Sequence, residues 1–279
     1  MKRSLVLALA LAAALPITAS AHKQWLVPSV TVVAGEGERW VTVDAAVSND
    51  LFYPDFVPVK LDNISVIAPD GSVGKPENGA TLKTRSVFDV NLAQQGTYRI
   101  ANVNEGLSAR WGERRAPGSK PPADPKASGS LRSVTVEELP TKIPAGAKNV
   151  EITETLSRIE TFITNGEPTP VKPTGKGLEL VPSTHPNDLF AGEEARFQLQ
   201  LDGKPAADLE VLIVRGATRY RNAQDEIRVT SDANGEFSVT WPEPGMYWLQ
   251  ARAQDKNTSV KEANARRLSY VATLEVLPQ

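Results

Sequence analysis

The chain has 279 residues, with 31 Lys and Arg against 33 Asp and Glu, two histidines and no cysteine. This balance lacks the concentrated basic face that nucleic-acid binding requires, so we exclude nucleic acid as a partner. Without cysteine there are no disulfides, Cys-based zinc sites or iron–sulfur clusters. Any metal ligand must be a histidine, a carboxylate, a carbonyl or the terminal amine.

The first 21 residues predict a cleaved signal peptide. Lys2 and Arg3 form a positive start, residues 5–15 are an apolar run, and Ala19-Ser20-Ala21 offers the small residues that a signal peptidase needs. The apolar run is too short to span a bilayer comfortably, which takes about 20 residues. We therefore expect cleavage between Ala21 and His22. The product would be a soluble protein of the periplasm, without membrane insertion.

The remaining chain predicts an all-β fold. In residues 195–201 and 237–241, apolar and polar side chains alternate with the period of a half-buried strand. Asp70-Gly71 and Asn234-Gly235 are typical of tight β-hairpin turns, because these residue types tolerate positive φ.

Three pairs of similar segments indicate that one β frame is used twice. "LVPS" occurs at 26–29 and again at 180–183, and "AGEGERW" (34–40) resembles "AGEEARF" (191–197). "QGTYRI" (95–100) likewise parallels "PGMYWL" (244–249), and a Gly turn followed by Tyr is a corner device of β-sandwiches. Reuse of common turn patterns by any sandwich is the alternative explanation. Both explanations predict two sandwich-like domains.

Composition places the domain boundary near residue 175. Residues 112–130 are rich in Pro, Gly and Ser and predict a mobile loop, whereas the Pro-rich residues 167–177 predict an inter-domain linker. We expect an N-terminal sandwich over 22–175 and a C-terminal sandwich over 176–279. The second resembles immunoglobulin-like or prealbumin-like modules, which alone do not define a function.

Several motifs resemble one bacterial family. They are the "AHKQWLVP" start after the signal, "GLELVPSTHPNDLFAGEEARFQL" (177–199) and the tail "PGMYWLQA" (244–251). Together they resemble the periplasmic family catalogued as domain of unknown function 4198. The resemblance implies an accessory role in nickel or cobalt uptake, and it points to His22 and His185. A histidine at the second or third mature position, used by some nickel-uptake proteins, is replaced here by Lys23 and Gln24.

Cleavage before His22 would place a free amine beside an imidazole. The pKa of an α-amino group is about 7.7–8.0, so the group loses its proton to a metal at modest cost. With His185 as the second imidazole, three nitrogens would form a histidine brace, and such a site suits Cu(II) or Ni(II). Asp188 is a candidate further ligand or hydrogen-bond partner of a ligand. The alternative is that the terminal His is idle, His185 is a loop residue bonded to backbone, and Asp188 is an Asx-turn residue.

These observations predict a non-catalytic periplasmic protein that binds nickel, cobalt or copper for a membrane transporter or a TonB-dependent receptor. The alternative is a structural or protein-binding β-sandwich module associated with an outer-membrane receptor or transporter. A copper oxidase is disfavoured because aromatic residues are only 6% of the chain and no flat aromatic face is indicated. Ser183, His185 and Asp188 contain the letters of a hydrolase triad, but triads are defined by geometry and come from distant segments.

Overall fold

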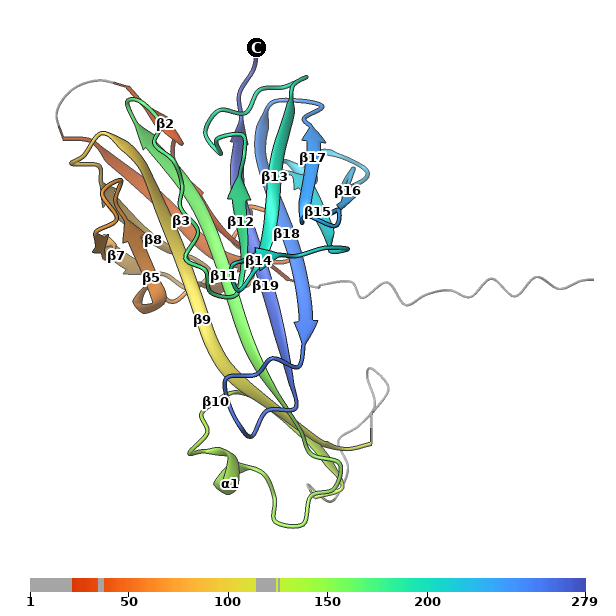
Figure 1. Cartoon of the computed structure of the whole chain (residues 1–279). Coiled ribbons are helices and arrows are strands. Elements are labelled where there is room, and N and C mark those ends of the chain that lie inside the picture. The colour runs from red at the N-terminus through yellow and green to blue at the C-terminus, as the bar shows by residue number, and fades with distance from the viewer. Residues whose placement is uncertain (1–21, 35–37, 114–123, 125) are drawn as a thin grey trace, which may run out of the picture.

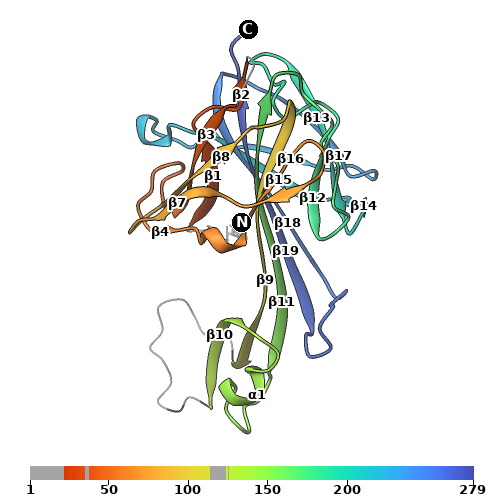
Figure 2. The same ribbon diagram turned by 90° about the vertical axis from the view of Figure 1, so that its left-hand side faces the viewer.

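The computed structural model describes residues 22–34, 38–113, 124 and 126–279, and over these residues the chain is an all-β protein of three sheets (Figures 1 and 2). The predicted signal peptide lies outside the described residues. The first sheet contains β1 (Lys23–Pro28), β3 (Trp40–Ser48), β8 (Ser86–Asn91), β7 (Glu77–Thr81) and β4 (Val57–Pro58). The third sheet contains β12 (Leu178–Pro182), β13 (Glu194–Leu201), β14 (Lys204–Pro205) and β17 (Glu236–Thr240).

Between them lies a central sheet of ten strands. Its main order is β16 (Ile227–Thr230), β15 (Glu210–Arg215), β18 (Gly245–Asp255), β19 (Ala265–Val276), β11 (Glu151–Asn165), β9 (Gly96–Gly112), β5 (Ile64–Ile67) and β6 (Val73–Gly74). In addition β10 (Ser128–Val134) pairs with β9, and β2 (Val32–Val33) pairs with β11.

Both faces of the central sheet are buried. Successive side chains of a strand point to opposite faces, so Ile159 and Ile163 of β11 join the core under the first sheet, whereas Phe162 joins the core under the third. On β18, Trp248 belongs to the first core and Tyr247 to the second. The molecule is thus a three-layer arrangement in which the first and third sheets cover opposite faces of the central one (Figure 2).

The predicted boundary near residue 175 falls between β11 and β12, but strands from both halves of the chain belong to the central sheet. β11 and β19 pair in parallel over nine residues of each strand, from Thr153↔Ala265 to Thr161↔Thr273. Each core also takes side chains from both halves of the chain. The two halves therefore share a sheet and two cores instead of meeting only through a linker.

The repeated motifs occupy equivalent places. The two "LVPS" segments lie in β1 and β12, which pair with β3 and β13 in the two outer sheets. Tyr98 of β9 accepts a hydrogen bond from the Gln94 N–H at 2.7 Å, and Tyr247 of β18 donates to the Glu243 carbonyl at 2.7 Å. In both halves a buried Tyr hydroxyl bonds the backbone four residues upstream, as a tyrosine corner does.

One predicted hairpin is wrong. Gly235 has φ 74° and closes a turn onto Asp232, but the strand that follows, β17, pairs with β13 of the third sheet. The Asn234-Gly235 turn therefore carries the chain from the central sheet to an outer one. By contrast, Gly71, with φ 87°, lies in the predicted hairpin between β5 and β6.

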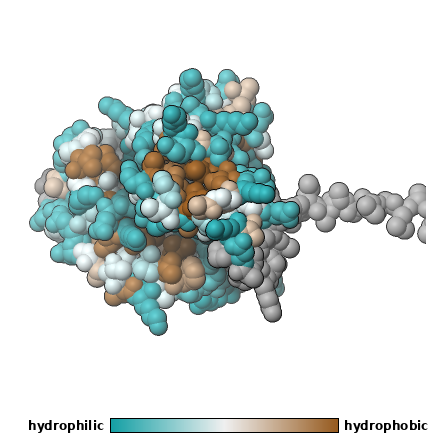
Figure 3. Space-filling view, turned by 90° about the horizontal axis from the view of Figure 1, so that it is seen from below, coloured by the Kyte–Doolittle hydropathy of each residue, from teal (hydrophilic) through white to brown (hydrophobic). Residues whose placement is uncertain are grey.

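The long strands β9 and β11 project beyond the sandwich and carry a small lobe with its own apolar cluster (Figure 1). The last residues of the predicted loop 112–130 belong to β10, in which Ser128 pairs with Gly112; residues 114–123 and 125 lie outside the described residues. Seen from below, the surface of the molecule shows apolar areas between hydrophilic side chains (Figure 3). The helical elements are α1 (Leu139–Lys142), η1 (Leu61–Asn63) and η2 (Thr218–Tyr220). No helix within the described ranges has the length and apolar character of a membrane span.

A buried ionic cluster lies where the two halves meet. Arg158 of β11 lies 3.1 Å from Glu160 and 3.8 Å from Glu179 of β12, measured between Nη and Oε atoms. Tyr270 of β19 donates to the second Glu160 oxygen at 2.9 Å, and burial together with the Glu160 charge raises the pKa of this tyrosine well above its usual value. Side chains of three strands from both halves are thereby fixed to one another.

Candidate functional site

His185 is part of the interior framework. Its Nε2 lies 3.1 Å from the Thr169 carbonyl and 3.0 Å from the Thr97 hydroxyl, and its Nδ1 accepts the Asn187 N–H at 3.2 Å. Because a carbonyl only accepts, Nε2 carries the proton and Nδ1 is the acceptor. Burial lowers the pKa of His185, and the Thr169 carbonyl and the Asp188 charge oppose this shift. Both ring nitrogens are thus occupied by protein groups.

The residues after His185 tie the loop that follows β12 to the central sheet and to the segment between β1 and β2. Asn187 donates from Nδ2 to the carbonyls of Thr31 and Phe162 at 2.9 and 3.1 Å. Asp188 is exposed, and its N–H closes a turn onto the His185 carbonyl at 3.0 Å. The segment is thus a turn in which the polar groups of His185 and Asn187 bond other parts of the chain.

His22 lies at the other end of β1. It directly precedes Lys23, the first residue of β1, whereas the His185 loop is bonded to Thr31, beyond the last. The six residues of β1 alone extend roughly 20 Å. The structure therefore does not bring His22 together with His185 and Asp188. Nor do the described ranges hold any group of three or more His, Asp or Glu residues placed to share an ion.

The His22 imidazole is exposed and stacks on Phe56, with ring centroids 4.1 Å apart. Around it, three segments distant in the sequence converge: residues 22–23, the loop 49–56 between β3 and β4, and the loop 216–226 between β15 and β16. We call their common face the amino-terminal surface.

The two loops of the amino-terminal surface contact each other under backbone strain. Phe52 has φ 64° and Ala217 has φ 59°, in the left-handed region that bulky or ordinary L-residues rarely adopt. A Cβ at Gly216 would lie 2.9 Å from the Phe52 ring, so the close approach requires glycine there. Left-handed non-Gly residues cost about 1–3 kcal/mol each and persist where the surrounding structure enforces them, often at functional sites.

Arg221 holds the second loop in shape from within. Its guanidinium donates to the Gly216 carbonyl at 2.7 Å and lies 3.2 Å from the Asp225 carboxylate. It also donates to the carbonyls of Arg215 and Gln224, at 2.9 and 3.0 Å. Arg221 therefore fixes the loop, and its hydrogen-bonding groups are committed.

Aromatic side chains form the rim of this surface. Arg219 lies over the ring of Tyr53 at 4.0 Å from the centroid and 3.5 Å from the Asp50 carboxylate. Partial burial and a hydrogen bond with Tyr220 raise the pKa of Tyr53. Tyr220 and Phe56 are 79% and 45% exposed, an unusual presentation for residues of this size.

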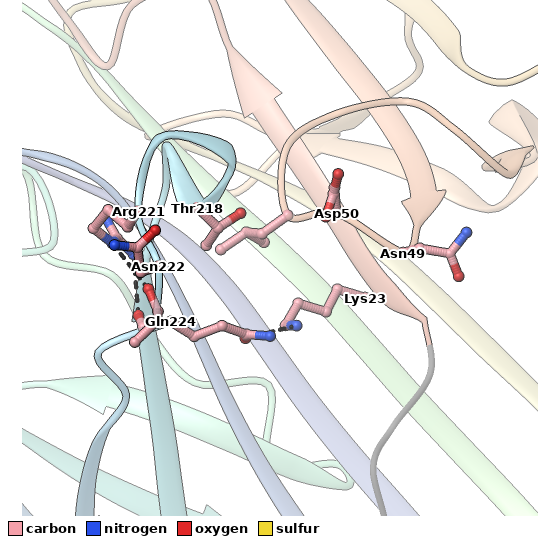
Figure 4. Close-up of a pocket in the computed structure, with 9 residues that line it drawn as sticks. Lys23, Asn49, Asp50, Thr218, Arg221, Asn222 and Gln224 are labelled. Carbon is pink, nitrogen blue, oxygen red and sulfur yellow. Dashed lines mark hydrogen bonds between the residues drawn. The ribbon is translucent and has the colours of Figure 1, made fainter.

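A polar pocket of about 160 Å³ opens between the three segments (Figure 4). Lys23 is half-buried there and donates from Nζ to Gln224 Oε1 at 3.1 Å; burial lowers its pKa, opposed by the charges of Glu226 and Asp50. Among the described residues, the Thr218 hydroxyl is shielded from solvent without a hydrogen-bond partner. The lining is Lys23, Asn49, Asp50, Leu51, Thr218, Arg221, Asn222, Ala223 and Gln224.

Two other pockets are larger but less distinctive. One, of about 510 Å³, surrounds Arg266, which bridges Asp202 and Asp255 at 2.7 Å each. The other, of about 490 Å³, is lined by amides and hydroxyls, Asn102 and Asn104 among them. In both, polar groups at the wall already bond one another.

Sequence reasoning missed Lys23, Thr218 and the loop 216–226. The segment "GATRYRNAQDE" (216–226) places two Arg and a Tyr in a polar loop, but the sequence does not show which other segment this loop contacts. Its meaning depends on the 49–56 loop, which lies about 160 residues earlier in the chain.

Comparison with known protein families assigns the chain to one of them. The model of the family "Domain of unknown function (DUF4198)" matches residues 19–255. The chain belongs to this family. It was predicted from sequence motifs, whereas the nickel or cobalt association is an implication that this match does not address.

No curated protein matches the chain. Among solved structures, similarity extends to the "D0-D1 domain of Intimin", with 10% identity, a TM-score of 0.22, and coverage of 90% of this chain and 97% of that one. An Escherichia coli alpha-2-macroglobulin activated by porcine elastase matches with 14% identity and a TM-score of 0.19, over 90% of this chain and 30% of the other. A Salmonella alpha-2-macroglobulin mutant gives 13% identity and a TM-score of 0.18, over 90% and 23%.

Proposed function

We propose that this DUF4198 protein is an exported, non-catalytic binding module that contacts its partner through the amino-terminal surface. The partner class is an outer-membrane receptor or a membrane transporter, as the family resemblance implies. Export rests on residues 1–21, whose charged start and apolar run are those of a signal peptide.

The observation that carries this proposal is the pair of strained loops. Two segments of the chain keep Phe52 and Ala217 in costly backbone conformations exactly where they touch each other. The result is a polar pocket flanked by the exposed aromatic rings of Tyr220 and Phe56. Rigid aromatic side chains with polar tips supply much of the binding energy in protein interfaces.

Site-specific photo-crosslinking in cells tests the proposal. A photoreactive phenylalanine at Tyr220 should give a discrete adduct with one membrane-associated protein. The same residue at Val73, which is 68% exposed on β6, is the matched control and should give none. With the adduct partner purified, Tyr220→Ala should weaken binding by about tenfold or more. No adduct from position 220, or equal adducts from both positions, would refute the proposal.

A second proposal concerns metal binding at His22. We infer from the exposed, oriented His22 ring that cleavage before it would create an amine–imidazole chelate for Ni(II), Co(II) or Cu(II). His185 and Asp188 take no part, since they lie beyond the far end of β1.

The test compares the chain that begins at His22 with one carrying an extra N-terminal glycine. Calorimetric titration with each metal should show 1:1 binding to the first protein only, and His22→Ala should abolish it. Binding that survives the extra glycine would overturn the chelate.

A further inference from the structure

We propose that the Lys23 pocket binds a carboxylate group of the ligand. This inference rests on the proposed function and names the chemistry by which the amino-terminal surface recognises its partner. The carboxylate belongs to an acidic side chain of a protein or to a small free acid.

The first argument is the charge balance at the pocket. Lys23 is half-buried and forms no ion pair within the described residues. The two acidic groups that act on it are engaged elsewhere: Asp50 lies 3.5 Å from Arg219, and Glu226 is bonded to Arg228. A charge removed from water without a partner is costly, so an anion placed against Nζ would stabilise the ammonium group.

The second argument is the arrangement of donors. The ammonium group has three N–H bonds, and Gln224 takes one. Figure 4 shows the Lys23 side chain reaching toward Gln224 across the pocket, with the Asp50 carboxylate turned away from Lys23. Two N–H bonds of the Lys23 ammonium group thus remain for the oxygens of a carboxylate.

The third argument separates a carboxylate from a phosphate. Phosphate sites use several cations or a cluster of backbone N–H groups. Here the guanidinium of Arg221 is committed to carbonyls of its own loop, and that of Arg219 to Tyr53 and Asp50. One available cation matches a single negative charge.

Trp248 provides a built-in reporter. Lys23 Nζ lies 5.9 Å from the centre of the Trp248 ring, and the indole N–H donates to the Gln24 carbonyl at 2.9 Å. An event at the Lys23 ammonium group should therefore shift the indole ¹H–¹⁵N resonance of Trp248.

The test titrates the protein with succinate, with inorganic phosphate, and with a blocked Gly-Ser-Glu-Ser-Gly peptide and its Gln counterpart. We expect saturable Trp248 shifts with the Glu peptide or with succinate, at least about fivefold weaker with the Gln peptide. Lys23→Gln should weaken binding about tenfold. The control Lys204→Gln removes the same charge from exposed β14 and should change nothing.

The outcomes separate the sources and the alternatives. A Glu peptide that binds much tighter than succinate assigns a protein segment as the source, because the aromatic rim then adds contacts; equal affinities assign a free acid. Phosphate binding as tight as either, equal binding of the Gln peptide, or no effect of Lys23→Gln overturns the inference. If these titrations fail while Tyr220 still crosslinks, the carboxylate assignment falls and the proposed function stands.

Discussion

The two histidines of this chain occupy opposite kinds of environment. His185 lies among β9, β12 and the 167–177 segment, with both ring nitrogens bonded to protein groups. His22 stands exposed at the start of β1, stacked on Phe56. The difference teaches that the surroundings of an imidazole, more than its presence in a motif, determine what chemistry is left for it.

The charged residues repeat this contrast. Arg158, buried in β11, pairs with Glu160 and Glu179, whereas Lys23, next to His22, bonds a neutral amide at the edge of a pocket. The interior groups neutralise one another and fix the sheets. The groups at the amino-terminal surface leave binding capacity for a ligand.

The largest expected effect tests the interior half of this comparison. Arg158→Ala leaves Glu160 and Glu179 buried without their main cation, so the free energy of unfolding should fall by about 3–5 kcal/mol. Arg196→Ala, which breaks an exposed pair with Glu194, should cost less than about 1 kcal/mol. Urea denaturation measures both; equal losses would show that the cluster is not a stabilising centre.

A smaller loss is expected at His185 itself. His185→Ala leaves the Thr169 carbonyl and the Asn187 N–H without this partner, so stability should fall by about 1–3 kcal/mol. His22→Ala should change it by less than about 0.5 kcal/mol, because its ring is exposed. Thermal denaturation of both variants gives the comparison, and a larger loss at His22 would reverse our assignment of roles.

The contrast between His185 and His22 also predicts how the stability of the protein depends on pH. Burial lowers the pKa of His185 in the folded chain, whereas in the unfolded chain it is about 6.5. Between these two values the unfolded chain binds more protons, so the His185 contribution is complete above about pH 6.5 and is lost as pH falls toward the folded value. Urea midpoints between about pH 5 and pH 8 should rise less with pH in His185→Gln than in His22→Gln. Identical profiles would contradict a neutral, half-buried His185.

The smallest effect concerns the strained loop. Ala217→Gly relieves a left-handed conformation, and after the entropic cost of glycine it should raise stability by about 0.5–1 kcal/mol. Ala207→Gly, at an exposed position without positive φ, should lower it slightly. If the loop is shaped for binding, Ala217→Gly should also weaken the Tyr220-dependent interaction, measured with the crosslinked partner. A variant that is less stable than the wild type would refute the strain.

Part of the fold was readable from local patterns. Alternation in residues 195–201 and 237–241 predicted β13 and β17, and the Gly–Tyr pairs predicted the corners at Tyr98 and Tyr247. The parallel pairing of β11 with β19 was not readable, because it joins residues more than a hundred positions apart and leaves no local signature. Nor could the sequence show that the Asn234-Gly235 turn changes sheets.

The candidate site residues likewise include some that the sequence identified and some that only the structure identified. Residue types and motifs singled out His22, and the family motif singled out His185, but whether the two meet depends on where β1 runs through the molecule. Lys23, Thr218 and Phe52 carry no motif at all. Lys23 and Thr218 line one pocket with residues of the 49–56 loop, and Phe52 of that loop packs against Gly216 of the other loop.

The sequence by itself determined an all-β protein, similar turn-and-strand motifs in its two halves and membership of a family. The tertiary structure alone decided that the halves share a central sheet, that one histidine serves the interior, and that a lysine pocket forms beside the other. The physical reason is the range of the interactions. Strand alternation and turn preferences act between neighbours in the chain, whereas strand pairing, desolvation and the pairing of charges depend on residues that only folding brings together.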